Sequence, residues 1–292
     1  MRADLHTHSR VSDGTDSPGE LVRKAKDAGL DLVALTDHDT AAGWPEATAA
    51  AREIGIGFVP GMEISTQLDD RAIHLLAYLP DPTYEPLVDE LDAVLLGRAG
   101  RVPTMVAKLQ ELGIVITEDD VFAQSEDAAA TGRPHVADAL VALGVVASRD
   151  EAFEHYLGWG KPAYARRYAA PFDTMVRLVA GAGGVTVIAH PWGRRSVPWP
   201  DEAELARMRE VGLTGIEVDH EDHAPEQRDR LRAIARNLGL AATGASDYHG
   251  TGKIAHDLGV NTTAADQVER LLEAAAAASQ ASGRETPEAV LP

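Results

Sequence analysis

Short apolar runs alternate with amphipathic helical segments over most of this chain. Near the N-terminus, a helical segment over 17–29 is followed by an apolar run over 30–35 and then by a second helical segment. After residue 171 the order returns, with predicted strands over 185–189, 215–218 and 240–245. Strands that alternate with helices form parallel sheets. A chain of 292 residues is long enough for such a sheet to close, so the pattern predicts an α/β barrel.

Between residues 83 and 170 this alternation stops, and helical patterns occur without apolar strands. We expect residues 83–170 to form an inserted helical subdomain that covers the barrel mouth as a substrate lid. Residues 1–82 and 171–263 would then form the barrel. Residues 264–292 are expected to add one helix with an alanine run and a disordered tail.

The composition limits which partners the chain can bind. Its formal net charge is -19, whereas an extended nucleic-acid duplex requires clustered Lys and Arg, so a nucleic-acid substrate would be recognised only locally. No apolar run reaches the roughly 18 residues of a membrane-spanning helix, and the N-terminus carries no basic and apolar leader. We therefore expect a cytoplasmic protein without a membrane partner. Because the chain has no cysteine, nitrogen and oxygen must hold any metal ion.

Two pairs of metal-ligand residues stand at opposite ends of the chain. The first lies in Asp4-Leu5-His6-Thr7-His8 and the second in Asp247-Tyr248-His249. On a β-strand, side chains two residues apart leave the same face, so His6 and His8 point together, as do Asp247 and His249. Imidazole and carboxylate are the ligands of zinc, iron and manganese rather than of calcium, which predicts a transition-metal site.

Further residues of this kind occur in or just after the predicted strands, where α/β barrels place their active sites. Six of the 11 histidines and three carboxylates make nine candidate ligands: His6, His8, Asp13, His38, Glu63, His74, His190, Asp247 and His249. Nine ligands are too many for one tetrahedral ion. They suit two or three divalent transition-metal ions, such as Mn, Fe or Zn, that share a bridging carboxylate.

The charge of such a site predicts its substrate. Three divalent cations facing three carboxylates keep a net positive charge even if every histidine is neutral, so the site would attract an anion. A phosphate ester fits, because clustered ions can hold its oxygens and lower the pKa of a water, giving a metal-bound hydroxide that attacks phosphorus. The sequence therefore predicts a metal-dependent phosphoesterase.

The same motifs resemble, in order, those of the PHP (polymerase and histidinol phosphatase) superfamily. They are Asp4-Leu5-His6-Thr7-His8, Thr36-Asp37-His38-Asp39, Gly61-Met62-Glu63, His74, Ala189-His190-Pro191 and Ser246-Asp247-Tyr248-His249. The resemblance covers roughly residues 1–262, and the motifs are highly specific as a set. It implies a distorted (β/α)7 barrel, here with an inserted helical subdomain, and a trinuclear metal site.

The resemblance also implies how the nine ligands divide among the ions. His6, His8, Glu63 and Asp247 would hold the first ion, and Asp13, His38 and His249 the second. Glu63 would bridge to a third ion, completed by His74 and His190. Many PHP proteins have histidine where Asp13 stands.

The aspartate, the short chain and the insertion are more similar to one subgroup, which contains nucleoside 3′,5′-bisphosphate phosphatases and a 5′-to-3′ exoribonuclease acting on short RNAs. This implies a nucleotide or short oligonucleotide as substrate.

Two segments of the insertion look like the substrate-facing loops of that subgroup, namely 131–135 and 160–164. In them, Arg133 would grip a phosphate bidentately, and His135 and Lys161 would add further donors. Arg98 and Arg101 stand three residues apart on a helical segment and can share a face toward the same site.

His220 and His223 follow the strand that ends near Glu217, so each is a candidate to contact phosphate or to protonate the leaving group. An exposed polar loop is an equal alternative for both histidines. Glu217 could reach the metal ions or could simply end its strand.

Other residues have plainer interpretations. We expect Asp4, Asp37 and Asp39 to orient imidazoles rather than to bind metal. His155 and His256 are expected to be ordinary surface residues.

Three other activities stay open. A histidinol-phosphate phosphatase would also cleave a phosphomonoester. A PHP barrel could hold metal without turnover, as a binding or regulatory module. An amidohydrolase is less favoured, because those barrels add a bridging lysine midway through the chain and no lysine stands at a convincing strand end here.

Overall fold

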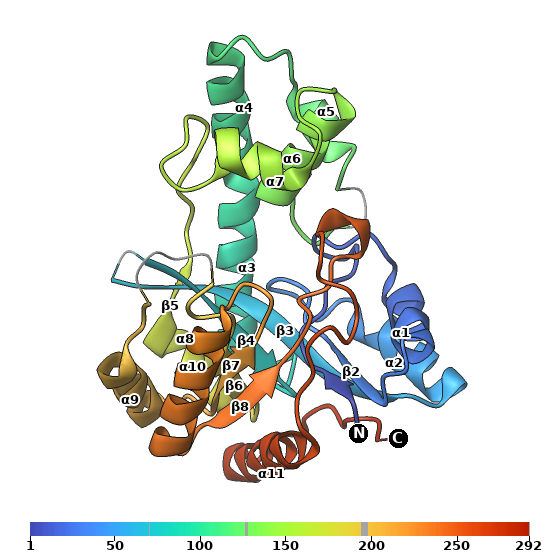
Figure 1. Ribbon diagram of the computed structural model, residues 1–292, viewed down its shortest axis with the longest axis vertical. Coiled ribbons are helices and arrows are strands. Elements are labelled where there is room, and N and C mark those ends of the chain that lie inside the picture. The colour runs from blue at the N-terminus through green and yellow to red at the C-terminus, as the bar shows by residue number, and fades with distance from the viewer. Residues whose placement is uncertain (70, 126–127, 194–197, 292) are drawn as a thin grey trace.

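The computed structural model describes residues 1–69, 71–125, 128–193 and 198–291. Figure 1 shows a strongly twisted sheet surrounded by helices, with a second group of helices standing above one end of it. Both chain termini lie at the opposite end, close to the last helix. The molecule therefore has one end near the termini and one end near the second helical group.

Seven strands follow one another around the sheet in the order β1-β2-β3-β4-β6-β7-β8, and β5 pairs with β3 outside this path. Their bounds are β1 Ala3–Asp4, β2 Leu32–Leu35, β3 Gly57–Leu68, β4 Arg71–Tyr78, β5 Ala170–Pro171, β6 Val185–Ile188, β7 Gly215–Asp219 and β8 Ala241–Gly244. The expectation of a distorted barrel is confirmed, but the sheet is not all parallel. β4 runs antiparallel to both β3 and β6, because two residues separate β3 from β4 and a parallel crossover needs a dozen or more.

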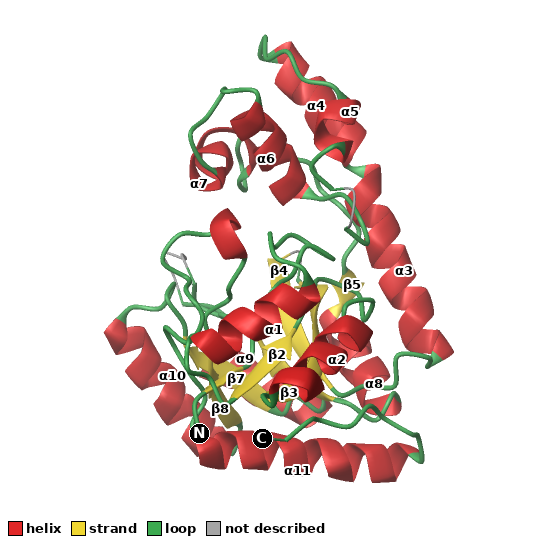
Figure 2. Ribbon diagram, turned by 90° about the vertical axis from the view of Figure 1, so that its right-hand side faces the viewer, coloured by secondary structure: helices red, strands yellow, loops and turns green. Residues whose placement is uncertain are grey.

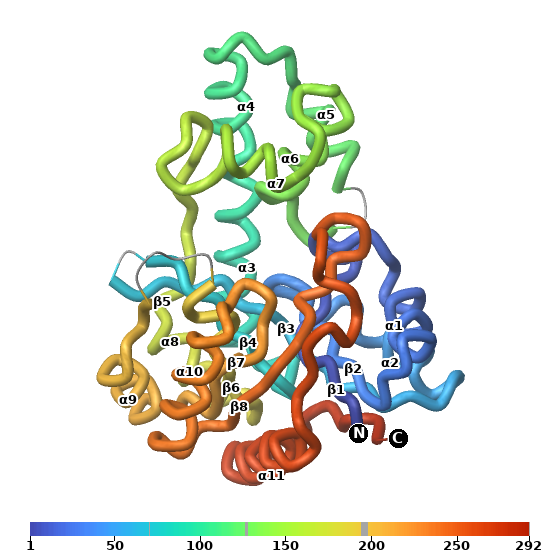
Figure 3. Tube along the Cα trace, viewed as in Figure 1, coloured from blue at the N-terminus to red at the C-terminus, as the bar shows by residue number. Residues whose placement is uncertain are grey.

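The chain segments that follow β1 and β8 close the barrel. Thr7 and Tyr248 form a parallel bridge, the Asp247 amide donates to the His6 carbonyl at 2.9 Å, and the His8 amide donates to the Tyr248 carbonyl at 2.8 Å. Figure 3 shows the blue segment after β1 and the orange segment after β8 running close together. This closure brings the two predicted pairs of ligands side by side.

Six helices cover the outside of the barrel: α1 Pro18–Asp27, α2 Trp44–Ile54, α8 Phe172–Gly181, α9 Glu202–Val211, α10 Pro225–Leu238 and α11 Ala265–Ser282. α1 begins with a capping box, in which the Ser17 side chain accepts from the Glu20 amide and Glu20 accepts from the Ser17 amide. Its apolar stripe, formed by Leu21, Val22 and Ala25, is buried in the main core. No described helix is long and apolar enough to cross a membrane.

The inserted segment is helical as expected and has a hydrophobic cluster of its own. It contains α3 Glu85–Gly100, α4 Val102–Glu111, α5 Glu118–Phe122, α6 Arg133–Ala142, α7 Arg149–Ala152 and a π-helical turn η1 Phe153–Leu157. Met105, Leu109, Val136 and Leu140 belong to this separate cluster. Figure 2 shows α3 rising from the barrel toward the other inserted helices. Leu87, Leu91 and Val94 of α3 pack in the main core, so this helix anchors the insertion to the barrel.

The tail after α11 differs from the expectation of disorder. Phe58 and Val290 form an antiparallel bridge with two backbone hydrogen bonds of 2.8 Å. The Arg284 guanidinium donates to Asp81 at 2.8 Å and lies 4.1 Å from the centre of the Tyr84 ring. The polar composition of the tail could not predict these contacts, because the backbone of Val290 supplies two of them.

Candidate functional site

The nine predicted ligands converge at the end of the barrel that faces the insertion. His6, His8, Asp13, His38, His190, Asp247 and His249 stand in the segments after strands, and Glu63 and His74 lie within β3 and β4. All nine occur in groups of three whose donor atoms lie within 4.8 Å of one another. The side chains that the sequence singled out therefore meet in one cluster.

Glu63 lies at the centre of this cluster. Its Oε2 is 3.4 Å from His6, 3.2 Å from His8 and 3.2 Å from His38. Its Oε1 is 2.7 Å from His74 and 3.1 Å from His190. Burial alone would raise the pKa of this carboxyl, but the surrounding imidazoles, His74 first, hold it well below its usual range. Each oxygen thus serves a different set of histidines, as a bridging ligand requires.

Two aspartates complete the cluster on the side of β8. Asp13 approaches His8 at 3.7 Å, His38 at 3.6 Å and His249 at 3.4 Å. Asp247 Oδ1 is 3.4 Å from His8 and 3.5 Å from His249. His249 and His8 therefore each face both carboxylates.

The donor set fits divalent transition-metal ions. Burial lowers the pKa of His38, His74 and His249, which keeps these imidazoles neutral with a lone pair free to bind metal. Three carboxylates and six imidazoles packed together would be costly to bury without cations between them. His190 and Asp247 also hold positive φ angles of 28° and 54°, a local strain that is common at functional sites.

Further buried carboxylates hold the ligands in place. Glu217 accepts from His6 Nδ1 at 3.1 Å and from the His190 amide at 2.7 Å. Asp37 accepts from the Ser9 amide at 2.8 Å and from the Ser12 hydroxyl at 2.6 Å, which ties down the loop that carries Asp13. These contacts give Glu217 an orienting role, which differs from both roles that the sequence left open for it.

A cavity of about 620 Å³ opens above the cluster and is lined by both metal-ligand residues and arginines. Its arginines are Arg98, Arg101, Arg133, Arg149 and Arg167. Arg98 is occupied by Asp39 and Ser65, at 2.6 Å and 2.8 Å. By contrast, the buried Nε atoms of Arg101 and Arg133 have no hydrogen-bond partner among the described residues.

The arginines also repel one another. Burial, followed by the charges of Arg133, Arg167 and Arg98, lowers the pKa of Arg101 well below its usual range. Burial and the charge of Arg98 lower the pKa of Arg167 to about 10. Buried guanidinium nitrogens that lack a partner, as the Nε atoms of Arg101 and Arg133 do among the described residues, are costly until an anion joins them, so this wall of the cavity is suited to bind a phosphate.

Of the other residues predicted to contact the substrate, two line a cavity and one does not. Arg133 lines the cavity, and His135 lines a small hollow beside Asp13 and His38. His135 Nδ1 accepts from the Gly132 amide at 2.9 Å, which leaves its other nitrogen for further contacts. Lys161 is exposed and is not among the described residues that line the cavity, although Trp159 of the same loop is.

His220 and His223 are buried, which contradicts the exposed-loop alternative. His220 accepts from the Asp222 amide on one nitrogen and lies 3.3 Å from Asp247 on the other. His223 lies 2.8 Å from the Val218 carbonyl and accepts from the Trp192 amide at 3.3 Å. With both nitrogens engaged in this way, neither ring faces the cavity as a free proton donor. Their contacts are those of groups that orient Asp247 and the loop after β7.

Several residues at the site escaped the sequence prediction. Lys253 lines the cavity and pairs with Asp247, and Arg167 and Trp159 line it from the end of the insertion. His256, expected at the surface, is buried, and its Nδ1 donates to the Ser246 carbonyl at 2.6 Å. The sequence indicated Lys253 and His256 only by their closeness to the Asp247 motif, which they follow by a few residues. His155 is exposed as expected.

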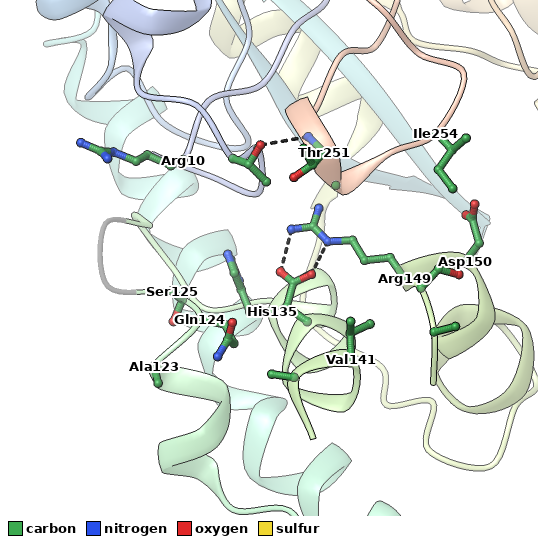
Figure 4. A pocket seen from close by; sticks show the side chains of 17 residues that line it. Arg10, Ala123, Gln124, Ser125, His135, Val141, Arg149, Asp150, Thr251 and Ile254 are labelled. Carbon is green, nitrogen blue, oxygen red and sulfur yellow. Dashed lines mark hydrogen bonds and ion pairs between the residues drawn. The ribbon is translucent and has the colours of Figure 1, made fainter. Parts of the chain in front are cut away.

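A second cavity of about 700 Å³ lies on the other side of Arg149 (Figure 4). Figure 4 shows Arg149 reaching across it to a carboxylate of the insertion. This is Asp138, bound through Nε at 2.5 Å and Nη2 at 2.6 Å, while Nη1 donates to the Asp13 carbonyl at 2.7 Å. Arg149 therefore separates the two cavities and joins the insertion to the loop of a predicted ligand.

Comparison with known proteins identifies the family. Residues 4–91 match the PHP domain. The chain is 34% identical over 246 residues to the 5′-3′ exoribonuclease of Haemophilus influenzae, a match that covers 84% of this chain and 89% of that protein. The chain belongs to the PHP family. The 3′,5′-nucleoside bisphosphate phosphatase of Chromobacterium violaceum is also 34% identical, over 88% of this chain and 90% of that protein.

Solved PHP structures have the same fold. A structure from Bifidobacterium adolescentis, assigned as a metal-dependent phosphoesterase, is 40% identical with a TM-score of 0.89, covering 93% of this chain and 96% of that one. A Chromobacterium violaceum structure described as an amidohydrolase, with bound sulfate and no metal, is 33% identical with a TM-score of 0.84, covering 94% and 97%. The chain is therefore a PHP-family metal-dependent phosphoester hydrolase, as its sequence predicted.

Proposed function

We propose that this protein removes phosphate from small nucleotides that carry two phosphates, such as nucleoside 3′,5′-bisphosphates, or cleaves the 5′ end of short RNAs. One observation carries the proposal. A single cavity joins the nine predicted metal ligands to Arg101 and Arg133, whose buried Nε atoms have no partner among the described residues. One phosphoryl group would bind at the ligand cluster while a second anionic group binds at the arginines. Relatives named for nucleoside bisphosphates and for RNA support this substrate class.

We assign the nine residues to three ions. His6, His8, Glu63 and Asp247 would hold one ion, Asp13, His38 and His249 a second, and Glu63, His74 and His190 a third. Nitrogen and oxygen donors suit Mn, Fe or Zn. When bound, such ions would lower the pKa of a water and stabilise charge on the ester oxygens.

The protein side chains would orient the substrate and its surroundings. Glu217 keeps the His6 ring facing inward through the 3.1 Å contact to Nδ1. Lys253, paired with Asp247, adds a cation at the edge of the cluster. Arg101 and Arg133 would hold the second anionic group and fix the distance to the scissile ester. The inserted residues 83–170 would act as the lid that supplies these arginines.

The assay compares phosphate release from adenosine 3′,5′-bisphosphate, adenosine 5′-monophosphate and histidinol phosphate, with Mn²⁺ supplied. A short 5′-phosphorylated RNA provides a fourth substrate, for which release of a mononucleotide is measured, because cleavage of a phosphodiester frees no inorganic phosphate. We expect the bisphosphate or the RNA to be preferred, which would exclude the histidinol-phosphate alternative. Preference for histidinol phosphate would overturn the proposal.

Two variants separate the two parts of the site. Arg101→Gln is expected to raise KM for the bisphosphate about 10-fold or more, since it removes a charge-assisted contact, and to affect the monophosphate much less. A His8→Ala, Asp247→Ala double variant should lose both metal and turnover. His155→Ala, which alters an exposed histidine, is the matched control and should behave like the wild type. Unchanged turnover in the double variant would contradict the assignment of ligands.

A further inference from the structure

Trp159 is exposed at the rim of the substrate cavity. Its side chain is 67% exposed although tryptophan is among the largest apolar side chains. It lines the same cavity as Arg101, Arg133 and the metal-ligand residues. An indole left in water at this place is unusual, because burial of an aromatic ring is strongly favourable.

Backbone hydrogen bonds hold the loop that carries Trp159 in a defined conformation. The Gly158 amide donates to the Phe153 carbonyl at 2.8 Å, and the Lys161 amide donates to the Gly158 carbonyl at 3.0 Å. Gly160 has a φ of 73°, in the left-handed region that favours glycine. The turn therefore holds the tryptophan outward, toward the cavity rim.

Aromatic contacts connect Trp159 to Arg133, one of the arginines that line the cavity. Its ring packs edge-to-face against Tyr164, with 5.1 Å between the ring centres. The guanidinium of Arg133 lies 5.7 Å from the centre of the same Tyr164 ring. On the other side, the guanidinium of Arg166 lies 5.7 Å from the Trp159 ring. The indole is thus one ring away from the arginine that would bind a phosphate.

From this arrangement we propose that Trp159 is a stacking surface for the base of the bound nucleotide. The inference rests on the proposed function, because the phosphates anchored at the ligand cluster and arginines determine where the base projects. A cavity of about 620 Å³ accommodates a ligand much larger than phosphate alone. Stacking on an aromatic ring is tolerant of base identity, since every base has a π-face.

A nucleobase suits this surface better than a protein partner does. Trp159 lines the catalytic cavity itself, next to buried cations that select an anion. The part of a nucleotide that remains outside the anion site is a flat, apolar-faced base. Trp159 would therefore contribute affinity for nucleotides over other phosphate esters without choosing among bases.

The test compares a nucleotide with its base-free analogue. In the Mn²⁺-loaded enzyme, KM is measured for adenosine 3′,5′-bisphosphate and for the abasic tetrahydrofuran 3′,5′-bisphosphate, in wild type, Trp159→Ala and Trp159→Phe. We expect Trp159→Ala to raise KM for the nucleotide about 10-fold and to leave the abasic KM unchanged. Trp159→Phe, which keeps an aromatic face, should retain most of the affinity.

Phe122→Ala is the matched control, because Phe122 is an exposed aromatic residue of the insertion that does not line this cavity. It should change neither KM. Equal increases for both substrates in Trp159→Ala would show that the loop only supports the lid and would overturn the inference, as would an unchanged KM for the nucleotide.

Failure of the proposed function is recognised separately. If no bisphosphate is hydrolysed by the wild type, the quenching of tryptophan fluorescence by adenosine 5′-monophosphate is compared with that in Trp159→Phe. Quenching that disappears in the variant would still support base stacking at Trp159. Identical quenching in both proteins would overturn it.

Discussion

At the scale of single residues, Glu63 faces more histidines than the other carboxylates of the cluster. Five imidazoles face its two oxygens. Asp247 faces four histidines and Lys253, and Asp13 faces three histidines. In the proposed site, the carboxylate at this position would bridge neighbouring ions.

Glu63→Gln is expected to abolish the bridge, because an amide offers one oxygen where the carboxylate offers two. We expect bound metal per chain to fall and kcat/KM to drop by at least about 100-fold, more than is typical when an outer partner is lost. Metal content by mass spectrometry and phosphate release measure the two effects. His155→Gln is the control, and full metal retention in Glu63→Gln would contradict the bridging role.

His256 makes the folded protein sensitive to acid. Burial and the nearby Lys253 lower its pKa from the usual 6.5 to about 4. Because the unfolded chain binds this proton more readily, stability is unaffected above about pH 6.5 and is lost progressively as the pH falls toward 4. The cost at pH 4 is on the order of 2 kcal/mol.

His256→Asn retains a donor for the Ser246 carbonyl but cannot titrate. We expect the free energy of unfolding of the metal-free variant to fall by about 2 kcal/mol less than that of the metal-free wild type between pH 7 and pH 4. Urea unfolding at a series of pH values measures the difference. Parallel pH profiles for the two proteins would refute the assignment.

At the scale of elements, the connection between α7 and the barrel depends on Arg149. Its side chain pairs with Asp138 of α6 and donates to the carbonyl of Asp13. The short turn η2 Gly250–Gly252, which follows His249, leaves no room for a Cβ at Gly252 beside the same guanidinium. One inserted side chain thus contacts the segments that carry two predicted ligands.

Arg149→Ala is expected to loosen the Asp13 loop and to weaken metal binding by about 10- to 100-fold, the usual effect of losing an outer partner. Arg149→Lys should restore little, because lysine cannot bind Asp138 bidentately. Manganese retained after dialysis against graded chelator measures this. Arg232→Ala, which removes an exposed ion pair on α10, is the control. Unchanged retention in Arg149→Ala would mean that the barrel holds Asp13 unaided.

The hairpin of β3 and β4 was not predicted by the alternation of strands and helices in the sequence. β3 extends well beyond the apolar run that predicted it, and His74 pairs with Ser65 across the antiparallel ladder. Strand reversal therefore brings His74 diagonally beside Glu63. His74 therefore lies in the predicted cluster although β4 is antiparallel to both of its neighbours.

At the scale of the whole molecule, the C-terminal tail packs against the barrel near β3 and the segment after β4. It lies at the end of the barrel away from the insertion (Figure 1), where Val290 pairs with Phe58 and Arg284 with Asp81. The tail therefore belongs to the folded barrel and is separated from the catalytic cavity.

Truncation after Gly283 removes, among other contacts, the two backbone hydrogen bonds between Phe58 and Val290 and the ion pair between Arg284 and Asp81. We expect a loss of roughly 2 kcal/mol in stability, which lowers Tm by about 4 °C, with kcat/KM unchanged at 25 °C. Calorimetry and the phosphate-release assay provide the two readouts. An unaltered Tm would mean that the tail contributes nothing to folding, and a large loss of activity would mean that it reaches the site.

The net charge of -19 argues against a broad basic surface, but it gave no sign of the arginines that line the cavity. Arg98, Arg101, Arg133 and Arg167 are spread over about 70 residues of sequence between acidic segments. Only the packing of the insertion gathers them, so net charge could not predict the local field in the cavity.

By itself, the sequence determined which residues gather at one site and what chemistry they could support. Residue type and strand-end position are local properties, so the cluster of nine candidate metal ligands, the barrel and the family could be predicted from them. The tertiary structure alone decided which groups became outer supports, as with His220, His223 and His256, and which arginines and aromatic rings face the cavity. Those assignments depend on contacts between residues far apart in the chain. A local sequence pattern does not predict such contacts.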